Sequence, residues 1–128
     1  RARSAEVTVV SDGFGFYVGD ALARIGLRDL PVLTNAPDFA TGRLEFPHED
    51  RCCPCTTCGT CKQAPIRDAH DRGRITVLVG DGASDRKAAL VADHVLAKDP
   101  LARWCEEAGV PFVAIETLAD VRFELLGE

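Results

Sequence analysis

Two aspartates that follow an apolar segment have the types and spacing of a metal site. The run Ile75–Val79 is rich in β-branched residues and leads into Gly80-Asp81-Gly82-Ala83-Ser84-Asp85. Asp81 falls on the loop after this strand, and Asp85 falls on the first turn of the helix that follows. Carboxylate oxygens on one side of a strand end are the ligands that Mg²⁺ prefers. We therefore expect Asp81 and Asp85 to serve a magnesium site.

A second polar strand end and a lysine complete the set of candidates. Glu6–Ser11 reads as a buried strand that ends in a turn at Ser11-Asp12-Gly13. The hydroxyl and the free backbone N–H groups of that turn suit a phosphate oxygen. Lys62 lies between the two strand ends in sequence, where its charge would balance a phosphate. Each piece alone also fits an ordinary turn, a solvated helix residue or a surface lysine. Their order along the chain favours a phosphate site.

The elements that must position these residues alternate along the chain. We expect strands at 6–11, 30–34, 75–79, 94–97 and 111–115, and helices at 14–25, 65–71, 84–91, 100–108 and 117–126. Ser84 is a candidate N-cap, and Gly26 and Gly109 are candidate helix ends. Residues 38–46 read as a hairpin or an extended excursion around Thr41-Gly42. This alternation predicts an α/β fold, a Rossmann-like doubly wound parallel sheet. We expect one domain over 1–128, with a Cys-rich insertion at about 38–61.

Composition excludes several classes of function. The chain has 128 residues, a net charge of −5, and 15 Lys and Arg residues that are scattered rather than clustered. We therefore expect neither nucleic acid nor an anionic membrane as a partner. No apolar run approaches the roughly 20 residues of a membrane span. The start of the chain has no apolar region behind its two arginines and is not a secretory signal. We expect a cytoplasmic protein.

The order strand-Ser, lysine before a helix, strand-Gly-Asp-x-x-x-Asp resembles motifs two to four of the haloacid dehalogenase (HAD) phosphatases. The resemblance implies that Ser11 binds phosphate, Lys62 balances charge, and Asp81 and Asp85 serve Mg²⁺. Pro47-His48 and the Cys-rich run ending in Gly59-Thr60-Cys61-Lys62 resemble more closely the group of methylthiopentenyl phosphate phosphatase and its phosphoserine-phosphatase-like relatives. The similarity runs from about Val7 to about Pro111. It implies hydrolysis of a small phosphorylated metabolite through a phospho-aspartyl intermediate.

One motif of that family has no counterpart. The family's nucleophile comes from an Asp-x-Asp pair on its first strand, and no Asp-x-Asp occurs in these 128 residues. That strand would lie between the segments Val7–Ser11 and Ile75–Val79, whose unpaired backbone groups are costly to bury. We expect an upstream segment, or a strand from another copy, to fill this slot, with the cap segment also outside the chain. Alone, the chain is predicted to be inactive.

Five of the six cysteines fall between Cys52 and Cys61. Cys52, Cys55, Cys58 and Cys61 recur at every third position, a spacing at which thiolates wrap a tetrahedral Zn²⁺. An iron–sulfur cluster is a second reading of the spacing, although Lys62-Gln63 replaces the usual Cys-Pro continuation. Free or oxidised thiols that shape a loop are the third. The cluster also raises an alternative function, a noncatalytic zinc-binding or interaction module. The remaining cysteine, Cys105, is expected to be a buried small hydrophobic residue.

Overall fold

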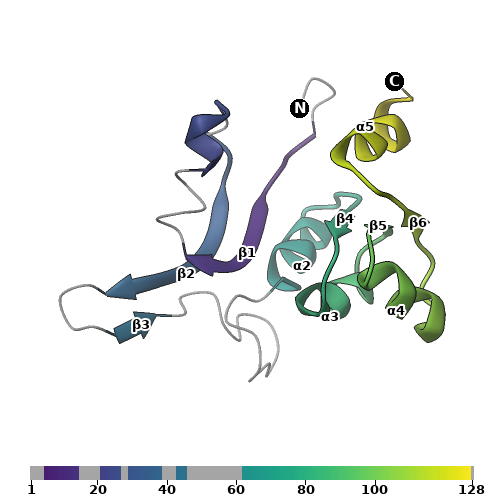
Figure 1. Ribbon diagram of the computed structural model, residues 1–128, viewed down its shortest axis with the longest axis horizontal. Helices are drawn as coiled ribbons and strands as arrows, with labels where there is room; N and C mark the ends of the chain where they lie inside the picture. Colours follow the sequence, from purple (N-terminus) through teal and green to yellow (C-terminus); the bar gives the residue numbers. More distant parts are fainter. Residues whose placement is uncertain (1–4, 15–20, 27–28, 39–42, 46–61, 128) are drawn as a thin grey trace. The chain divides into compact units, whose positions relative to one another are not determined.

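The computed structural model describes residues 5–14, 21–26, 29–38, 43–45 and 62–127 (Figure 1). The chain divides into two compact units, Arg1–Cys61 and Lys62–Glu128. None of the helices in the described ranges is long and apolar enough to cross a membrane.

The first unit contains a three-stranded sheet in the order β1-β2-β3. Strands β1 (Val9–Phe14) and β2 (Val32–Asp38) are parallel, and β3 (Arg43–Glu45) runs antiparallel to β2. The β2–β3 pair confirms the hairpin expected at 38–46, with Asp38 opposite Arg43. Residues 21–24 are helical. Gly26 ends this segment with φ +77°, a left-handed conformation that costs glycine little.

The turn predicted at Ser11-Asp12-Gly13 is wrong in one respect, because these residues lie inside β1. The ladder runs Val9 to Val32 and Val10 to Leu33, and then resumes at Phe14 opposite Asn35. Three residues of β1 therefore stand against one residue of β2, as in an extended bulge, which a strand tolerates where a small residue such as Gly13 interrupts it. Phe14 consequently ends a strand and does not begin a helix. Sequence periodicity does not reveal such an interruption.

The second unit is a parallel sheet in the order β4-β5-β6 with helices between its strands (Figure 1). Its elements, in chain order, are α2 (Ala64–Asp71), β4 (Val77–Gly80), the short 3₁₀ helix η1 (Ala83–Asp85), α3 (Arg86–Ala89), β5 (His94–Ala97), α4 (Leu101–Ala108), β6 (Val113–Ala114) and α5 (Leu118–Leu126). Each strand and helix expected here is present. The predicted α/β class with parallel strands is confirmed.

A small apolar core holds this unit together. Its fully enclosed members come from α3, β5 and α4, namely Ala89, Val95, Ala97, Leu101, Ala102 and Cys105. Leu78 of β4 and Phe112 pack against them from the neighbouring strand and the approach to β6. Cys105 is completely buried, as expected for a small hydrophobic residue, and desolvation raises the pKa of its thiol.

The helix ends follow local chemistry, with one correction. Gly109 adopts φ +73° at the C-cap of α4, which confirms the predicted stop. Thr117 precedes α5, and the Asp120 carboxylate accepts the backbone N–H groups of Glu116 and Thr117. The helix predicted from Ser84 instead begins as η1, with Gly82 at the N-cap position, so Ser84 is not the N-cap. The reason is that Asp85 supplies the capping carboxylate.

The family resemblance predicts a further strand between the segments Val7–Ser11 and Ile75–Val79. Within the first unit β1 pairs with β2, and within the second unit β4 pairs with β5. Around β4 the side chains of Ile75, Val77 and Val79 are 78, 40 and 41% exposed. These alternate side chains project from one face of the sheet, so their exposure describes that face. The presence of a further strand stays a prediction.

Candidate functional site at the carboxyl end of β4

The Asp85 carboxylate organises the loop that leaves β4. Its Oδ2 atom accepts the backbone N–H groups of Asp81 and Gly82, at 3.1 and 3.2 Å. Asp85 itself is only 6% exposed. A buried carboxylate needs such donors, and the loop needs an acceptor for N–H groups that no helix turn can satisfy. Asp85 therefore holds the loop in the shape that places Asp81.

Lys62, two residues before the start of α2, joins this arrangement. Its Nζ atom lies 2.9 Å from Asp85 Oδ1 and 2.8 Å from Ser84 Oγ. The two side chains of the ion pair are 11 and 8% exposed, so the charges attract in partly desolvated surroundings. Two of the predicted site residues, Lys62 and Asp85, are thus in direct contact. Their predicted roles in phosphate and metal binding stay predictions.

Gly80 makes room for the Asp85 carboxylate. A Cβ atom at position 80 would come within 2.7 Å of both Cγ and Oδ2 of Asp85, closer than real Cβ contacts. Gly82, two residues on, has no atom within 4 Å of the equivalent position. Glycine is therefore required at 80 by close packing and not at 82. The sequence signal for this was present, a glycine at the end of an apolar strand, which marks a close approach of another group.

Asp81 presents the exposed carboxylate of the site. Its backbone carbonyl accepts the N–H of Leu101 at 2.9 Å, which ties the loop to the start of α4. Asp81 is exposed, whereas the buried Asp85 carboxylate already accepts hydrogen bonds from Lys62 and two backbone N–H groups, so Asp81 is the more accessible of the two to an incoming cation. Mg²⁺ is often held by one or two carboxylates and keeps several waters, which fits this donor set. No group of three or more His, Cys, Asp or Glu residues gathers as a metal site within the described ranges.

The other predicted site residues divide into two sets. Ser11, Asp12 and Gly13 lie in β1 of the first unit, where the Ser11 side chain is partly buried. Their predicted role in phosphate binding is not tested. The four cysteines proposed for zinc, Cys52, Cys55, Cys58 and Cys61, lie outside the described residues, so the zinc site stays a prediction.

Sequence reasoning missed Ser84 as a partner of the lysine. It treated Ser84 as a helix cap, whereas the hydroxyl contacts Lys62, 22 residues away in the sequence. A serine near a helix start is so commonly a cap that its type alone did not suggest another function. Only the folded chain brings the two side chains together.

A second polar cluster lies where β4 and β5 begin. Asp93 Oδ2 accepts the backbone N–H of Thr76 at 2.8 Å and its hydroxyl at 3.0 Å, and His70 Nε2 lies 3.0 Å from the same oxygen. The hydrogen bonds from Thr76, assisted by His70, hold the pKa of the Asp93 carboxyl below its ordinary value. The cluster therefore links α2 to the first residues of two strands.

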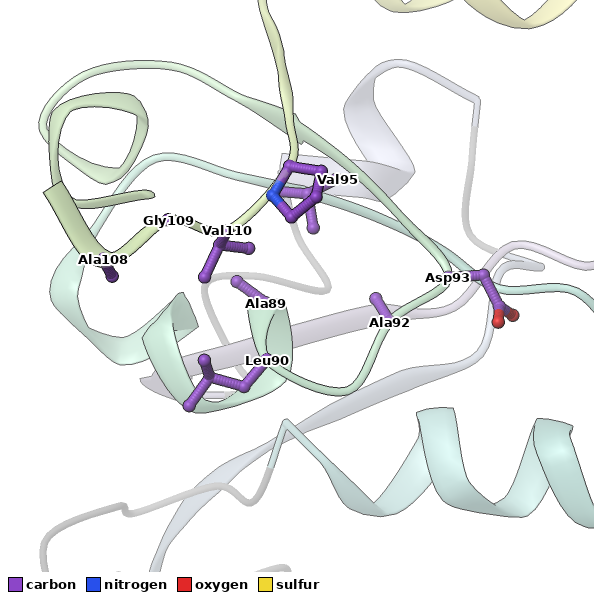
Figure 2. Close-up of a pocket in the computed structure, with 9 residues that line it drawn as sticks. Ala89, Leu90, Ala92, Asp93, Val95, Ala108, Gly109 and Val110 are labelled. Carbon is purple, nitrogen blue, oxygen red and sulfur yellow. The ribbon is translucent and has the colours of Figure 1, made fainter. Parts of the chain in front are cut away.

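The hollow in Figure 2 belongs to this opposite end of the strands. It has a volume of about 410 Å³ and is lined by nine residues, Ala89, Leu90, Ala92, Asp93, Val95, Ala108, Gly109, Val110 and Pro111. Asp93 is the only titratable residue among them, and its carboxylate is already bonded to Thr76. The lining thus offers no unengaged group for catalysis, and the carboxyl end of β4 remains the better candidate.

Comparison with known proteins finds similarity to a group of named phosphatases. The chain is 35% identical over 124 residues to the 2-hydroxy-3-keto-5-methylthiopentenyl-1-phosphate phosphatase of Exiguobacterium sibiricum, covering 94% of this chain and 56% of that protein. It is 32% identical over 123 residues to the phosphatase of the same name from Brevibacillus brevis, covering 94 and 55%. The resemblance to this phosphatase group is confirmed.

The similarity covers most of this chain but only part of each relative. A Bacillus cereus phosphatase of the same name is 35% identical over 120 residues, which cover 91% of this chain and 54% of the relative. The chain thus spans about half the length of the curated relatives it matches. No family model matches the chain.

Proposed function

We propose that this chain forms part of a magnesium-dependent phosphatase that hydrolyses the phosphate monoester of a small metabolite. The similarity to named phosphatases over 94% of the chain carries the proposal. The arrangement at the carboxyl end of β4 supports it, because ligands of parallel α/β sheets bind beyond the carboxyl ends of the strands. An exposed carboxylate at Asp81 beside the buried Lys62–Asp85 pair suits a phosphoryl group with its cation.

The relatives suggest the substrate. They are named for 2-hydroxy-3-keto-5-methylthiopentenyl-1-phosphate, a small phosphorylated metabolite of methionine salvage. We propose the same hydroxy-keto phosphate as the substrate here. A short phosphorylated chain of this kind carries its negative charge on one phosphate group, which suits a site where the Lys62 ammonium lies near the exposed carboxylate of Asp81.

We propose a role for each of these residues from the sequence and from the contacts at the end of β4. Lys62, held by Asp85 and Ser84, would neutralise the oxygens of the transferring phosphoryl group. Ser11 and the backbone N–H groups of Asp12 and Gly13 would bind phosphate oxygens. Asp81 would hold Mg²⁺, and Asp85, also predicted to serve the metal, would fix the loop and the lysine. The cation, when bound, supplies charge stabilisation for the phosphoryl oxygens.

The covalent steps need a nucleophile that is not among the 128 residues. The first aspartate of an Asp-x-Asp segment would attack phosphorus and form a phospho-aspartyl acyl phosphate, while the second aspartate gives its proton to the departing oxygen. Water would then attack phosphorus as the second aspartate takes a proton back, releasing inorganic phosphate and the free carboxylate. In both steps Lys62 would balance the negative charge on the phosphoryl oxygens.

Phosphate release by the complete protein tests the proposal. We expect hydrolysis of the hydroxy-keto phosphate that requires Mg²⁺, and a loss of at least ~100-fold in Asp81→Asn, since one key electrostatic contact is removed. Circular dichroism should show that the variant keeps its fold, because the Asp81 side chain is exposed. Near-normal turnover of Asp81→Asn at saturating Mg²⁺ would remove Asp81 from the metal site. An inactive complete protein would contradict the function.

The cysteine cluster and a cytoplasmic location remain further proposals from the sequence. If the thiolates bind zinc, the purified protein should carry about one equivalent, and a chelator should lower its melting temperature. Free thiols with neither zinc nor iron would contradict a metal site. Bound zinc in a complete protein that releases no phosphate would instead favour the alternative, a noncatalytic metal-binding module.

A further inference from the structure

Lys98 occupies the strand end next to that of Asp81. Gly80 and Ala97 are paired at the ends of β4 and β5, so Asp81 and Lys98 are the first residues beyond two adjacent strands. The backbone N–H of Lys98 donates to the carbonyl of Gly80 at 3.0 Å. Neighbouring strands lie ~4.8 Å apart, which is less than the reach of a lysine side chain. An ammonium group at position 98 is therefore within reach of a ligand bound at Asp81.

Hydrogen bonds fix the backbone that carries Lys98. Its carbonyl accepts the N–H of Ala102 at 3.0 Å, and the N–H of Leu101 reaches the Asp81 carbonyl at 2.9 Å. The Asp99 side chain accepts the N–H of Arg103 at 3.2 Å and thereby caps α4. The segment after β5 is thus tied both to the loop that presents Asp81 and to its own helix. The backbone position of Lys98, the first residue of this segment, is therefore fixed.

The two lysines at this edge differ in what engages them. Lys62 is largely buried and binds Asp85 and Ser84. Lys98 is exposed, and within the described ranges its ammonium group makes no hydrogen bond or ion pair. The first lysine is therefore committed to the phosphoryl group and its own carboxylate partner. The second remains available for another part of the same ligand.

We propose that Lys98 is a specificity-determining residue, which binds the hydroxy and keto oxygens next to the phosphate ester of the substrate. This inference rests on the proposed function. An ammonium group donates three hydrogen bonds, and carbonyl and hydroxyl oxygens accept them. A phosphate ester that lacks such oxygens gains nothing from Lys98. The residue thus favours oxygen-rich substrates over simple esters.

Two substrates distinguish binding of the hydroxy and keto oxygens by Lys98 from a role of Lys98 in phosphoryl binding or in folding. In the complete protein, Lys98→Gln should lower kcat/KM for the hydroxy-keto phosphate by ~10- to 100-fold, the effect of losing a charged hydrogen bond. The same variant should hydrolyse p-nitrophenyl phosphate, which has no such oxygens, within about twofold of the unaltered protein. Lys98→Arg keeps the charge and donors and should recover most of the lost activity. Arg103→Gln, an equal charge change at an exposed position of α4, is the matched control and should affect neither substrate.

Each other outcome overturns the proposal. Equal losses on both substrates would assign Lys98 to the phosphoryl group or to folding, and no loss on either would make it a solvated surface lysine. A complete protein that hydrolyses p-nitrophenyl phosphate with Mg²⁺ keeps the proposed phosphatase activity whatever Lys98 does. Failure to hydrolyse either substrate would instead contradict the proposed function and the role of Lys98 with it.

Discussion

Each end of β4 has a carboxylate that contacts both backbone N–H and a basic side chain, but the two clusters differ in burial. At the carboxyl end, the Asp85 carboxylate accepts two backbone N–H groups and binds the ammonium of Lys62. At the other end, the Asp93 carboxylate accepts the backbone N–H and hydroxyl of Thr76 and contacts the imidazole of His70. In each cluster, a side chain from α2 or from the residues before it contacts a carboxylate that follows β4 in the sequence. Both carboxylates link segments that are distant in sequence.

The two clusters differ in how deeply their charged side chains are buried. The side chains of Asp85 and Lys62 are 8 and 11% exposed, whereas those of Asp93 and His70 are 43 and 35% exposed. Water screens the exposed cluster, so its charges contribute little energy and cannot act strongly on a ligand. The enclosed pair interacts more strongly and lies beside the exposed Asp81. Similar hydrogen bonds therefore serve as a structural clamp at one end and as a candidate phosphoryl site at the other.

The largest expected effect on stability comes from neutralising Asp85. Asp85→Asn leaves the Lys62 ammonium largely buried without its counter-charge, and should lower the free energy of unfolding by about 3 kcal/mol. Urea denaturation at neutral pH measures this. The double variant Lys62→Met/Asp85→Asn should cost less than the sum of the two single changes, because they share one interaction. A cost for Asp85→Asn as small as that of Asp93→Asn would remove the contrast between the two ends.

A somewhat smaller effect is expected from adding a methyl group at Gly80. The new Cβ would come within 2.7 Å of the Asp85 carboxylate, which must then move away from the N–H groups of Asp81 and Gly82. Overpacking of this kind costs ~1–3 kcal/mol. In the complete protein, activity should fall as well, since the Asp81 loop loses its anchor. Thermal and urea unfolding, with phosphate release, measure both.

Gly82→Ala provides the matched control for Gly80→Ala. Position 82 has extended backbone angles, φ −126° and ψ −178°, and no atom within 4 Å of a new Cβ. The change should alter stability by less than about 0.5 kcal/mol. Equal losses from the two alanines would mean that loop flexibility matters, and not the space that Gly80 leaves for Asp85.

The smallest effect on stability is expected from Asp93→Asn at the exposed cluster, and it should disappear at low pH. Because the pKa of Asp93 lies below its ordinary value of 3.8 in the folded chain, its carboxylate stabilises the fold above that pH. This contribution is lost as the pH falls below 3.8 through the folded pKa. The stability difference between the unaltered chain and Asp93→Asn should therefore shrink in acid. A difference that is independent of pH would show that the Asp93 charge contributes nothing to the clamp.

Much of the second unit could be predicted from local sequence. The alternation of apolar strands with helical segments predicted β5 at 94–97 and the core around it, and Gly109 predicted the end of α4. These features depend on neighbours within a few residues, which the sequence displays directly. The same logic placed Asp81 on a loop and Asp85 at a helix start. The chain's similarity to phosphatases also rests on these residue types and their order.

Tertiary structure alone decided how these residues are used. Lys62 and Asp85 are 23 residues apart, and their ion pair forms only when α2 packs beside the end of β4. Whether Asp85 faces a cation or caps its own loop depends on the space left by Gly80 and on which N–H groups lack partners. The bulge at Ser11–Gly13 likewise depends on the register with β2. Residue types determine which interactions are possible, but burial and distance select among them, and both arise only when distant segments fold together.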